Sequence, residues 1–173
     1  PIGSFLGTLS PLTAPQLGAI AIRAALERAG VDPGKVDEVW MGNVLQAGVG
    51  QIPSRQAQIN GGIPKEVSSE TINKVCASGM RAVGMLDTAI RAGDIEVGVG
   101  GGMESMSNSP YLLPNARYGY RMGDGKMIDS MIVDGLWDVY NQYHMGITAE
   151  NVAKKFEISR EAQDAFAAAS QNK

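Results

Sequence analysis

The sequence has few of the residues that disulfides and metal sites require. Its 173 residues include one cysteine and one histidine. A single cysteine cannot form an internal disulfide, which fits a reducing compartment, and we expect a cytoplasmic location. A structural zinc site needs about four ligands, so we expect no metal. There is also no apolar run near the roughly 18 residues of a membrane span and no secretory signal pattern.

An excess of basic residues is absent too. There are 15 Lys and Arg residues against 18 Asp and Glu residues, which gives a net charge of −3. Nucleic-acid-binding domains normally carry a basic face, so we expect neither a nucleic acid nor a membrane as partner. Hydrophobic residues make up 44% of the chain, which is enough for a core in one domain, or in one domain plus part of another.

Neither end of the chain carries the usual boundary signals. The sequence opens on Pro1 without an initiator methionine. It stops at Lys173, within a segment that still has a helical pattern and no Gly or Pro stop. We therefore expect a fragment of a longer protein.

Helical and strand patterns alternate in the N-terminal part of the chain. Helices are predicted at residues 14–29, 54–60 and 77–92, and strands at 38–45, 71–75 and 95–99. This alternation favours an α/β layered fold with its sites at strand-to-helix turns.

The first predicted helix has clear end signals. Thr13 and Gln16 have the spacing of a capping box, and Gly30 stands where a left-handed C-terminal cap is expected. We expect one face of this helix to lie against a sheet. The residues of that predicted face are Leu17, Ile20, Ala21, Ala24 and Ala25.

The pattern changes near residue 105. Residues 105–143 are rich in Met, Gly, Asn, Tyr and Pro, with only a short helix predicted at 127–133. Stretches of this kind tend to carry function or interfaces rather than continue a sheet. Helices return at residues 148–156 and after Ser159, which is a good N-cap with Glu161 in the first turn.

Cys76 is the main candidate for chemistry. It is predicted to lie where the strand at 71–75 meets the helix at 77–92. Unpaired backbone N–H groups and the helix dipole favour negative charge there, and thiolate is the reactive form of cysteine. The same N–H groups can bind an oxyanion, and the small neighbours Ala77, Ser78 and Gly79 leave room for an acyl group. The residues alone leave a second interpretation open, a small buried hydrophobe.

Other candidates carry weaker signals. The glycine run at 100–102 lacks the third glycine of a dinucleotide fingerprint and the Gly-Lys-Ser/Thr of a phosphate loop, so close backbone packing is the better interpretation. His144 could pair with Cys76 as a base, but a lone histidine is more often structural. The loop with Arg117, Arg121 and Lys126 could contact an anionic ligand or a partner subunit, or be an ordinary solvated loop.

Several segments together resemble the thiolase family in its acetyl-CoA acetyltransferase branch. NKVCASGMRA at residues 73–82 resembles the segment around the nucleophilic cysteine, and GGMESMS at 101–107 a strand-end sequence. YHMGITAENVA at 143–153 resembles the segment whose His-Met pair lies beside the pantetheine of CoA. The stretches PIGSF at 1–5, MGDGKMID at 122–129 and EAQDAFA at 161–167 also fit, so the resemblance covers the whole chain.

The resemblance implies a fold and an activity. It implies a layered α/β fold, with a mixed sheet covered by helices and an incomplete first strand, at residues 1–105 and part of a CoA-covering loop domain at 106–173. The implied reaction is a Claisen condensation of two acetyl-CoA to acetoacetyl-CoA and CoA, or the reverse thiolysis. It runs through an acyl group on Cys76, with His144 and Met145 binding substrate. No cofactor is implied beyond the CoA thioesters themselves.

The resemblance also implies what is missing and what assembles. Thiolases use a Gly-His-Pro histidine, a Cys-x-Gly cysteine and an Asn-Glu-Ala-Phe motif, and none of these occurs in this sequence. We therefore expect the chain alone to be incomplete for catalysis. Thiolases are typically dimers or tetramers, and the loop at 117–126 and the strand before Cys76 fall in regions that usually meet partner subunits.

Three other functions are alternatives to the acetyl-CoA acetyltransferase interpretation. A 3-ketoacyl-CoA thiolase of longer chains is the neighbouring enzyme, although the pair His144 and Met145 favours the short-chain branch. A ketoacyl synthase shares the fold class but uses an acyl carrier protein, and the thiolase-like segments disfavour it. A non-catalytic assembly or acyl-CoA-binding fragment is the alternative from a different class.

Overall fold

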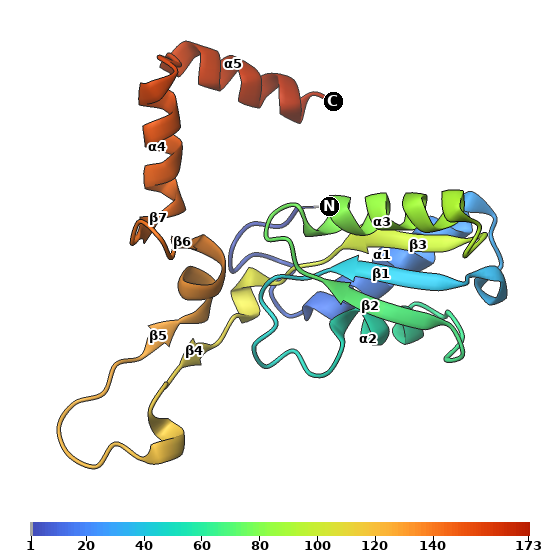
Figure 1. The fold of residues 1–173 in the computed structure, drawn as a ribbon, viewed down its shortest axis with the longest axis horizontal. Coiled ribbons are helices and arrows are strands. Elements are labelled where there is room, and N and C mark those ends of the chain that lie inside the picture. Colours follow the sequence, from blue (N-terminus) through green and yellow to red (C-terminus); the bar gives the residue numbers. More distant parts are fainter. Residues whose placement is uncertain (1) are drawn as a thin grey trace. The chain divides into compact units, whose positions relative to one another are not determined.

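The computed structural model describes residues 2–173 and divides into two compact units, Pro1–Gly135 and Leu136–Lys173 (Figure 1). The helices are α1 (Ala14–Ala29), α2 (Pro53–Asn60), α3 (Ser78–Ala92), α4 (Met145–Lys155) and α5 (Arg160–Gln171), with short helical turns η1 (Pro33–Lys35), η2 (Met106–Asn108), η3 (Ala116–Tyr118) and η4 (Ile132–Leu136). The strands are β1 (Glu38–Gly42), β2 (Ser68–Ile72), β3 (Gly98–Gly102), β4 (Tyr111–Leu112), β5 (Ile128–Asp129), β6 (Trp137–Asp138) and β7 (Tyr143–His144).

The first unit is built on a parallel sheet of three strands in the order β2-β1-β3. Gly42, the last residue of β1, lies opposite Ile72 of β2 and Gly102 of β3, so all three strands end at one edge. Along the chain, α1, α2 and α3 alternate with β1, β2 and β3. The predicted α/β layered fold is therefore confirmed, and parallel strands require these crossover helices.

Helices α1 and α2 cover one face of the sheet and form the main core with it. Val39 and Met41 point from β1 into this core and are 0% and 3% exposed. Around them lie buried residues of both helices and of the flanking loops. The members of this cluster are Ala14, Ile22, Leu26, Val36, Val39, Met41, Ala57, Ile63 and Met103.

The capping of α1 follows its sequence signals. The Gln16 N–H donates to Thr13 Oγ1 at 3.4 Å, and the Gln16 side chain accepts from the Thr13 N–H at 2.8 Å. Gly30 ends the helix in the left-handed conformation with φ of 64°. Both predicted ends are confirmed.

The predicted packing face of α1 is wrong. Gly18, Ala19 and Ile22 are buried, whereas Ile20 is 53% exposed. Nearly every turn of this helix carries small or apolar residues, so its periodicity is compatible with more than one face. The packed face is set by close approach, because a Cβ on Gly18 would lie only 3.1 Å from Ala57 Cβ.

Helix α3 covers the opposite face and rests directly on the backbone of β3. A Cβ on Gly100 would lie 3.3 Å from the Val83 backbone and 2.7 Å from Leu86 Cδ1. This confirms that the glycine run serves close backbone approach, although its residues form the strand itself instead of following it. Ala82 and Leu86 face the sheet, whereas Met80 and Val83 are 77% and 52% exposed.

Two predicted strands are displaced because polar side chains take their backbone N–H groups. β2 ends at Ile72 rather than at 75, since the Asn73 side chain accepts the Val75 N–H at 3.0 Å and turns the chain. β3 begins at Gly98 rather than at 95, since the Asp37 carboxylate accepts the N–H groups of Glu96 and Val97.

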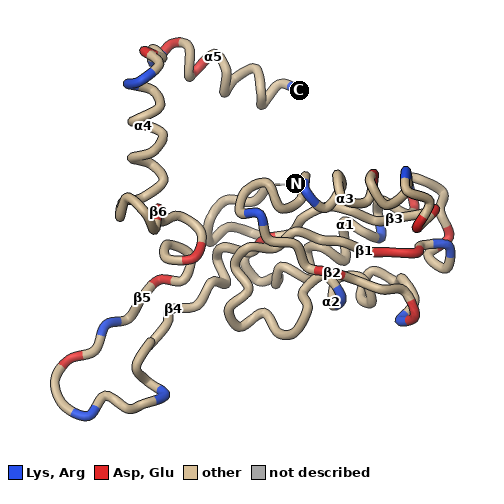
Figure 2. Tube along the Cα trace, viewed as in Figure 1, with Lys and Arg blue, Asp and Glu red and all other residues tan. Residues whose placement is uncertain are grey.

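The rest of the first unit is an excursion from the sheet. Strands β4 and β5 pair antiparallel and are joined by a long loop that carries Arg117, Arg121 and Lys126 (Figure 2). The short helix predicted at 127–133 is shifted, because residues 128–129 form β5 and helical turns follow through η4.

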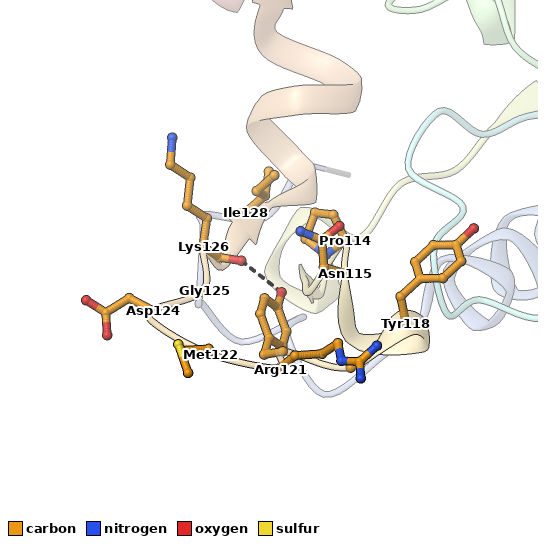
Figure 3. Close-up of a pocket in the computed structure, with 11 residues that line it drawn as sticks. Pro114, Asn115, Tyr118, Arg121, Met122, Asp124, Gly125, Lys126 and Ile128 are labelled. Atoms are coloured by element: carbon orange, nitrogen blue, oxygen red, sulfur yellow. Dashed lines mark hydrogen bonds between the residues drawn. The ribbon is translucent and has the colours of Figure 1, made fainter.

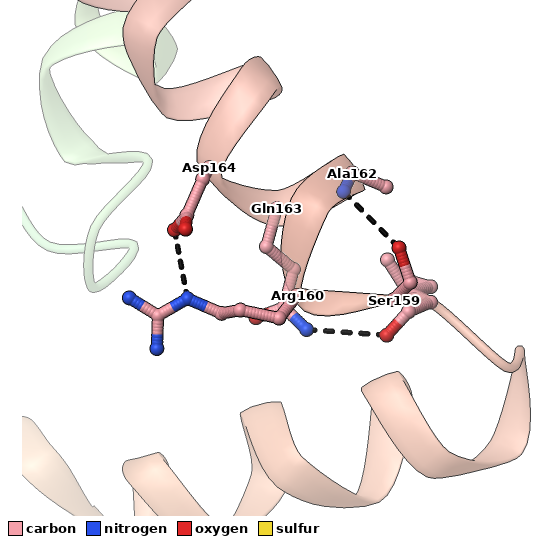
Figure 4. A network of polar contacts seen from close by, with 6 residues as sticks. Ser159, Arg160, Ala162, Gln163 and Asp164 are labelled. Atoms are coloured by element: carbon pink, nitrogen blue, oxygen red, sulfur yellow. Dashed lines mark hydrogen bonds and ion pairs between the residues drawn. The ribbon is translucent and has the colours of Figure 1, made fainter.

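The second unit consists of a β6–β7 pair followed by α4 and α5. α5 begins where predicted, with Ser159 Oγ accepting the Ala162 N–H at 3.2 Å and with an exposed Arg160–Asp164 ion pair of 2.8 Å (Figure 4). The predicted boundary between residues 105 and 106 separates the two domains that the family resemblance implies. It stays a prediction. Over residues 2–173, every helix is too short or too polar to cross a bilayer.

Asp37 gives a pH-dependent test of the loop that leads into β3. Hydrogen bonds from the backbone N–H of Val97 and, second, of Glu96 hold the pKa of the Asp37 carboxyl below its usual value. The folded pKa is the lower one, so the stabilisation is present above the unfolded pKa of about 3.9 and is lost as the pH falls through the folded value. We expect Asp37→Asn to lower the thermal midpoint by a few degrees at neutral pH, with a difference that shrinks below about pH 4.

The matched control is Asp94→Asn. Asp94 is exposed in the same region, and within residues 2–173 its side chain makes no hydrogen bond. Thermal unfolding followed by circular dichroism across the acid range measures both variants. A difference for Asp37→Asn that does not shrink as the pH falls below about 4 would contradict the assignment of the carboxylate as the stabilising species.

Candidate active site

Cys76 lies exposed in the turn of residues 73–77 that connects β2 to α3. The strand does not run directly into Cys76 as predicted, because residues 73–75 have already left the sheet. The helix begins at Ser78, with Ala77 as its N-cap, one residue later than predicted. The cysteine therefore stands two residues ahead of the first helical residue.

The turn before Cys76 is held by side chains on both sides. Asn73 Oδ1 accepts the Val75 N–H at 3.0 Å, and Ser78 Oγ accepts the Lys74 N–H at 2.9 Å. The same Ser78 hydroxyl donates to the Val75 carbonyl. Val75 itself has φ of 48°, which is strained for a β-branched residue.

Two of the first backbone N–H groups of α3 have no hydrogen-bond partner within residues 2–173. No side chain caps this helix, and the Ser78 N–H donates to the Val75 carbonyl at 3.0 Å. The next two N–H groups, of Gly79 and Met80, have no partner within residues 2–173. Free N–H groups at a helix start favour negative charge near them.

The first turn of α3 is seated on the end of β1 without room for a side chain between them. A Cβ on Gly42 would lie 2.6 Å from the Gly79 backbone N and 2.7 Å from Ser78 Cβ. Gly79 in turn packs on β3, because its own Cβ would lie 3.3 Å from the Gly102 backbone N. These contacts fix the position of the Cys76 turn relative to the carboxyl ends of β1 and β3.

Glu104 and Asn43 form a polar anchor at the same edge, which the sequence analysis missed. The Glu104 carboxylate accepts from Val44 N at 2.9 Å, Leu45 N at 3.1 Å and Asn43 Nδ2 at 2.7 Å. Asn43 is 1% exposed, and its Oδ1 has no partner within residues 2–173. β1 ends at Gly42 rather than at 45, since this carboxylate takes the N–H groups that would continue the strand. An acidic residue two positions after the end of a glycine-rich strand was the available signal.

His144 and Met145 lie together in the second unit, at the start of α4. His144 Nδ1 accepts the Gly146 N–H at 3.0 Å and caps the helix, so this nitrogen carries no proton in that arrangement. Met145 is the first helical residue and is 38% exposed. The helix predicted at 148–156 begins earlier than expected because histidine serves as its cap. Cys76 belongs to the first unit, so the pairing of His144 with Cys76 considered from the sequence stays a prediction.

The β4–β5 loop lines an open pocket of about 610 Å³ that contains none of the three predicted site residues. Tyr120 is one of the lining residues, and its hydroxyl donates to the Lys126 carbonyl at 3.4 Å. Figure 3 shows Lys126 with other lining residues of this loop. Arg121 and Asp124 also line the pocket. Within residues 2–173, no group of three or more His, Cys, Asp or Glu side chains could hold a metal ion.

The chain is similar to known proteins over almost its whole length. Residues 1–173 match the family described as "Thiolase, N-terminal domain". Over 172 residues, the chain is 62% identical to an acetyl-CoA acetyltransferase of Cupriavidus necator and 58% identical to one of Pseudomonas aeruginosa, covering 99% of this chain and 44% of each relative. A probable acetyl-CoA acyltransferase of Staphylococcus epidermidis is 53% identical over 173 residues. The chain spans less than half the length of these curated relatives.

The seat of α3 on β1 predicts a large cost for a small substitution. In Gly42→Ala the new methyl group meets backbone atoms at 2.6 Å, so β1 and α3 must separate. We expect the free energy of unfolding to fall by about 1–3 kcal/mol, which is typical of overpacking. Urea unfolding followed by circular dichroism measures the loss.

Gly101→Ala is the matched control on the adjacent strand. There the methyl group would meet Met41 Sδ at 3.6 Å and Cε at 3.7 Å, which are ordinary contacts. We expect little change in stability from this variant. Equal losses in both variants would show that the contact between Gly42 and α3 is not the tight one.

Proposed function

The chain belongs to the thiolase family, and we propose that it carries the acyl-accepting part of an acetyl-CoA C-acetyltransferase, with Cys76 as the nucleophile. One observation supports this most directly. The only cysteine of the sequence is exposed in the turn that leads into α3, beside two helix N–H groups without partners in the described residues 2–173.

In the first half-reaction, the Cys76 thiolate attacks the thioester carbonyl of acetyl-CoA. The new bond joins Sγ to the carbonyl carbon, and the carbonyl electron pair moves onto oxygen. The N–H groups of Gly79 and Met80 are the proposed donors to this oxyanion, in the manner of an oxyanion hole. Collapse of the intermediate expels the CoA thiolate and leaves an acetyl group on Cys76. Covalent catalysis divides one difficult transfer into two easier steps.

The second half-reaction needs groups beyond those of Cys76. A second acetyl-CoA loses a proton from its α-carbon, and the enolate attacks the acetyl-Cys76 carbonyl. Acetoacetyl-CoA forms and the thiolate is released, while thiolysis is the same path in reverse. These 173 residues contain no second cysteine and one histidine, which caps α4. We therefore assign this chain the first half-reaction and the complete condensation to the whole protein.

We propose that His144 and Met145 contact the pantetheine arm of CoA. Through Nδ1, His144 is tied to the start of α4, which leaves its Nε2 free to act as a donor. The partly exposed Met145 side chain offers an adaptable apolar surface next to it. CoA thioesters are the proposed substrates, and no further cofactor is proposed.

We further propose assembly into a homodimer or homotetramer in the reducing cytoplasm. β2 is an edge strand of its sheet, and such edges readily pair with another chain. The α3 residues Met80, Val83 and Ile90 are 45–77% exposed, an apolar surface suited to contact with further protein. A reducing compartment keeps Cys76 as the free thiol that the reaction needs.

Incubation of the chain with acetyl-CoA tests the first half-reaction. We expect intact-mass spectrometry to show one added acetyl group, located on Cys76 by peptide mapping, because the turn supplies both the nucleophile and the oxyanion donors. Cys76→Ala should show no adduct. Cys76→Ser should show acetylation slower by at least about two orders of magnitude, because a hydroxyl is a far weaker nucleophile than a thiolate.

A folded chain that remains unmodified would contradict the assignment of acylation to these residues. In that case the non-catalytic interpretation, an assembly or acyl-CoA-binding fragment, is the one to pursue. Circular dichroism of the same samples establishes that the chain is folded.

A longer-chain 3-ketoacyl-CoA thiolase is the second candidate. The name of the Staphylococcus epidermidis relative, a probable acetyl-CoA acyltransferase, is broader than acetyl transfer. Competition between acetyl-CoA and longer acyl-CoA thioesters for Cys76 distinguishes the two. A preference for acetyl-CoA supports the short-chain enzyme.

A further inference from the structure

We propose that Ser78 is a positioning residue for Cys76. The inference rests on the proposed function of Cys76 as the acyl acceptor and assigns a role to its neighbour two residues along the chain. Ser78 is 4% exposed, and its hydroxyl faces the turn instead of the solvent. It acts through the backbone and does not touch substrate.

The hydroxyl of Ser78 joins two backbone groups on either side of one peptide. It accepts the Lys74 N–H at 2.9 Å and donates to the Val75 carbonyl, which also accepts the Ser78 N–H at 3.0 Å. Residues 74–78 are thereby closed into a ring. Cys76 is inside this ring, so its Cα–Cβ direction is set by these bonds.

The ring holds a conformation that the chain would otherwise leave. Val75 has φ of 48°, and a β-branched side chain is strained in the left-handed region. Strain of this kind persists only where the surroundings fix it. The Asn73 side chain supports Val75 from the exposed side, and Ser78 supports it from the buried side.

The buried side is also the one that is fixed to the sheet. Ser78 Cβ lies where a Cβ on Gly42 would meet it at 2.7 Å, so the β-carbon of Ser78 rests against the end of β1. The end of β1 therefore supports Ser78, and the Ser78 hydroxyl in turn supports the strained turn. The consequence is a constant placement of Sγ relative to the N–H groups of Gly79 and Met80.

Acyl transfer depends on this placement more than simple alkylation does. The thioester carbonyl must meet Sγ and the oxyanion donors at once, and a misplacement of about 1 Å can cost 100-fold in rate. A small alkylating reagent needs only an exposed thiol, and Cys76 is exposed. The two reactions at the same sulfur therefore separate orientation from accessibility.

The experiment compares Ser78→Ala and Thr88→Ala in the full chain. Thr88 is the matched control, because it lies on the same helix and its hydroxyl donates to the Gly84 carbonyl at 2.9 Å. For each variant we measure the rate of Cys76 acetylation against acetyl-CoA concentration and the rate of alkylation by iodoacetamide. Because the chain has one cysteine, both rates report on Cys76 alone.

In Ser78→Ala we expect the saturating acetylation rate to fall about 10- to 100-fold. The acetyl-CoA concentration at half-maximal rate and the alkylation rate should stay unchanged. Thr88→Ala should match the wild type in both rates. Normal acetylation in Ser78→Ala, or an equal fall in alkylation, would overturn the positioning role.

A wild-type chain that is alkylated but never acetylated would refute the proposed function and not the role of Ser78. Amide exchange then decides the role of Ser78, because the Lys74 N–H donates to its hydroxyl. We expect that amide to exchange at least about tenfold faster in Ser78→Ala than in Thr88→Ala. Equal exchange in the two variants would overturn the proposal.

Discussion

The close approach of α3 to the sheet is the constraint on which the rest of the first unit depends. The helix rests on the backbone of β1 and β3, and at Gly42 a single methyl group would force the layers apart. Because the helix is so near, its first turn meets the common edge where the parallel strands end. The exposed Cys76 lies in the turn directly before this helix, so the position of the helix also sets the position of that turn.

Polar side chains, more than strand propensity, decide where the sheet stops. Asp37 takes the N–H groups ahead of β3, Glu104 those that follow β1, and Asn73 the one that follows β2. Each carboxylate or amide replaces a ladder bond with a local one, so the backbone leaves the sheet with its donors satisfied. The edge therefore carries shaped turns, and the strained Val75 is held within one of them.

The proposed chemistry divides between the two compact units. The first unit holds Cys76 with its oxyanion donors, and the second holds His144 and Met145 at the start of α4. In each case a helix start supplies the polar groups, as unpaired N–H donors at α3 and as a capped turn at α4. The chain belongs to the thiolase family, and the roles of both sites in CoA thioester chemistry are proposals that the single-cysteine experiments address for Cys76.

The sequence by itself determined the order of the elements from α1 to β3, the capped starts of α1 and α5, the family, and Cys76 as the residue to test. These follow from local signals, since a capping box or a helix-stop glycine acts within a few residues. Tertiary structure alone decided which face of α1 is buried, where β1 ends and β3 begins, and that Glu104 holds the turn after β1. Those outcomes depend on contacts between distant segments, such as Glu104 with Val44, and periodicity within one element carries no information about them.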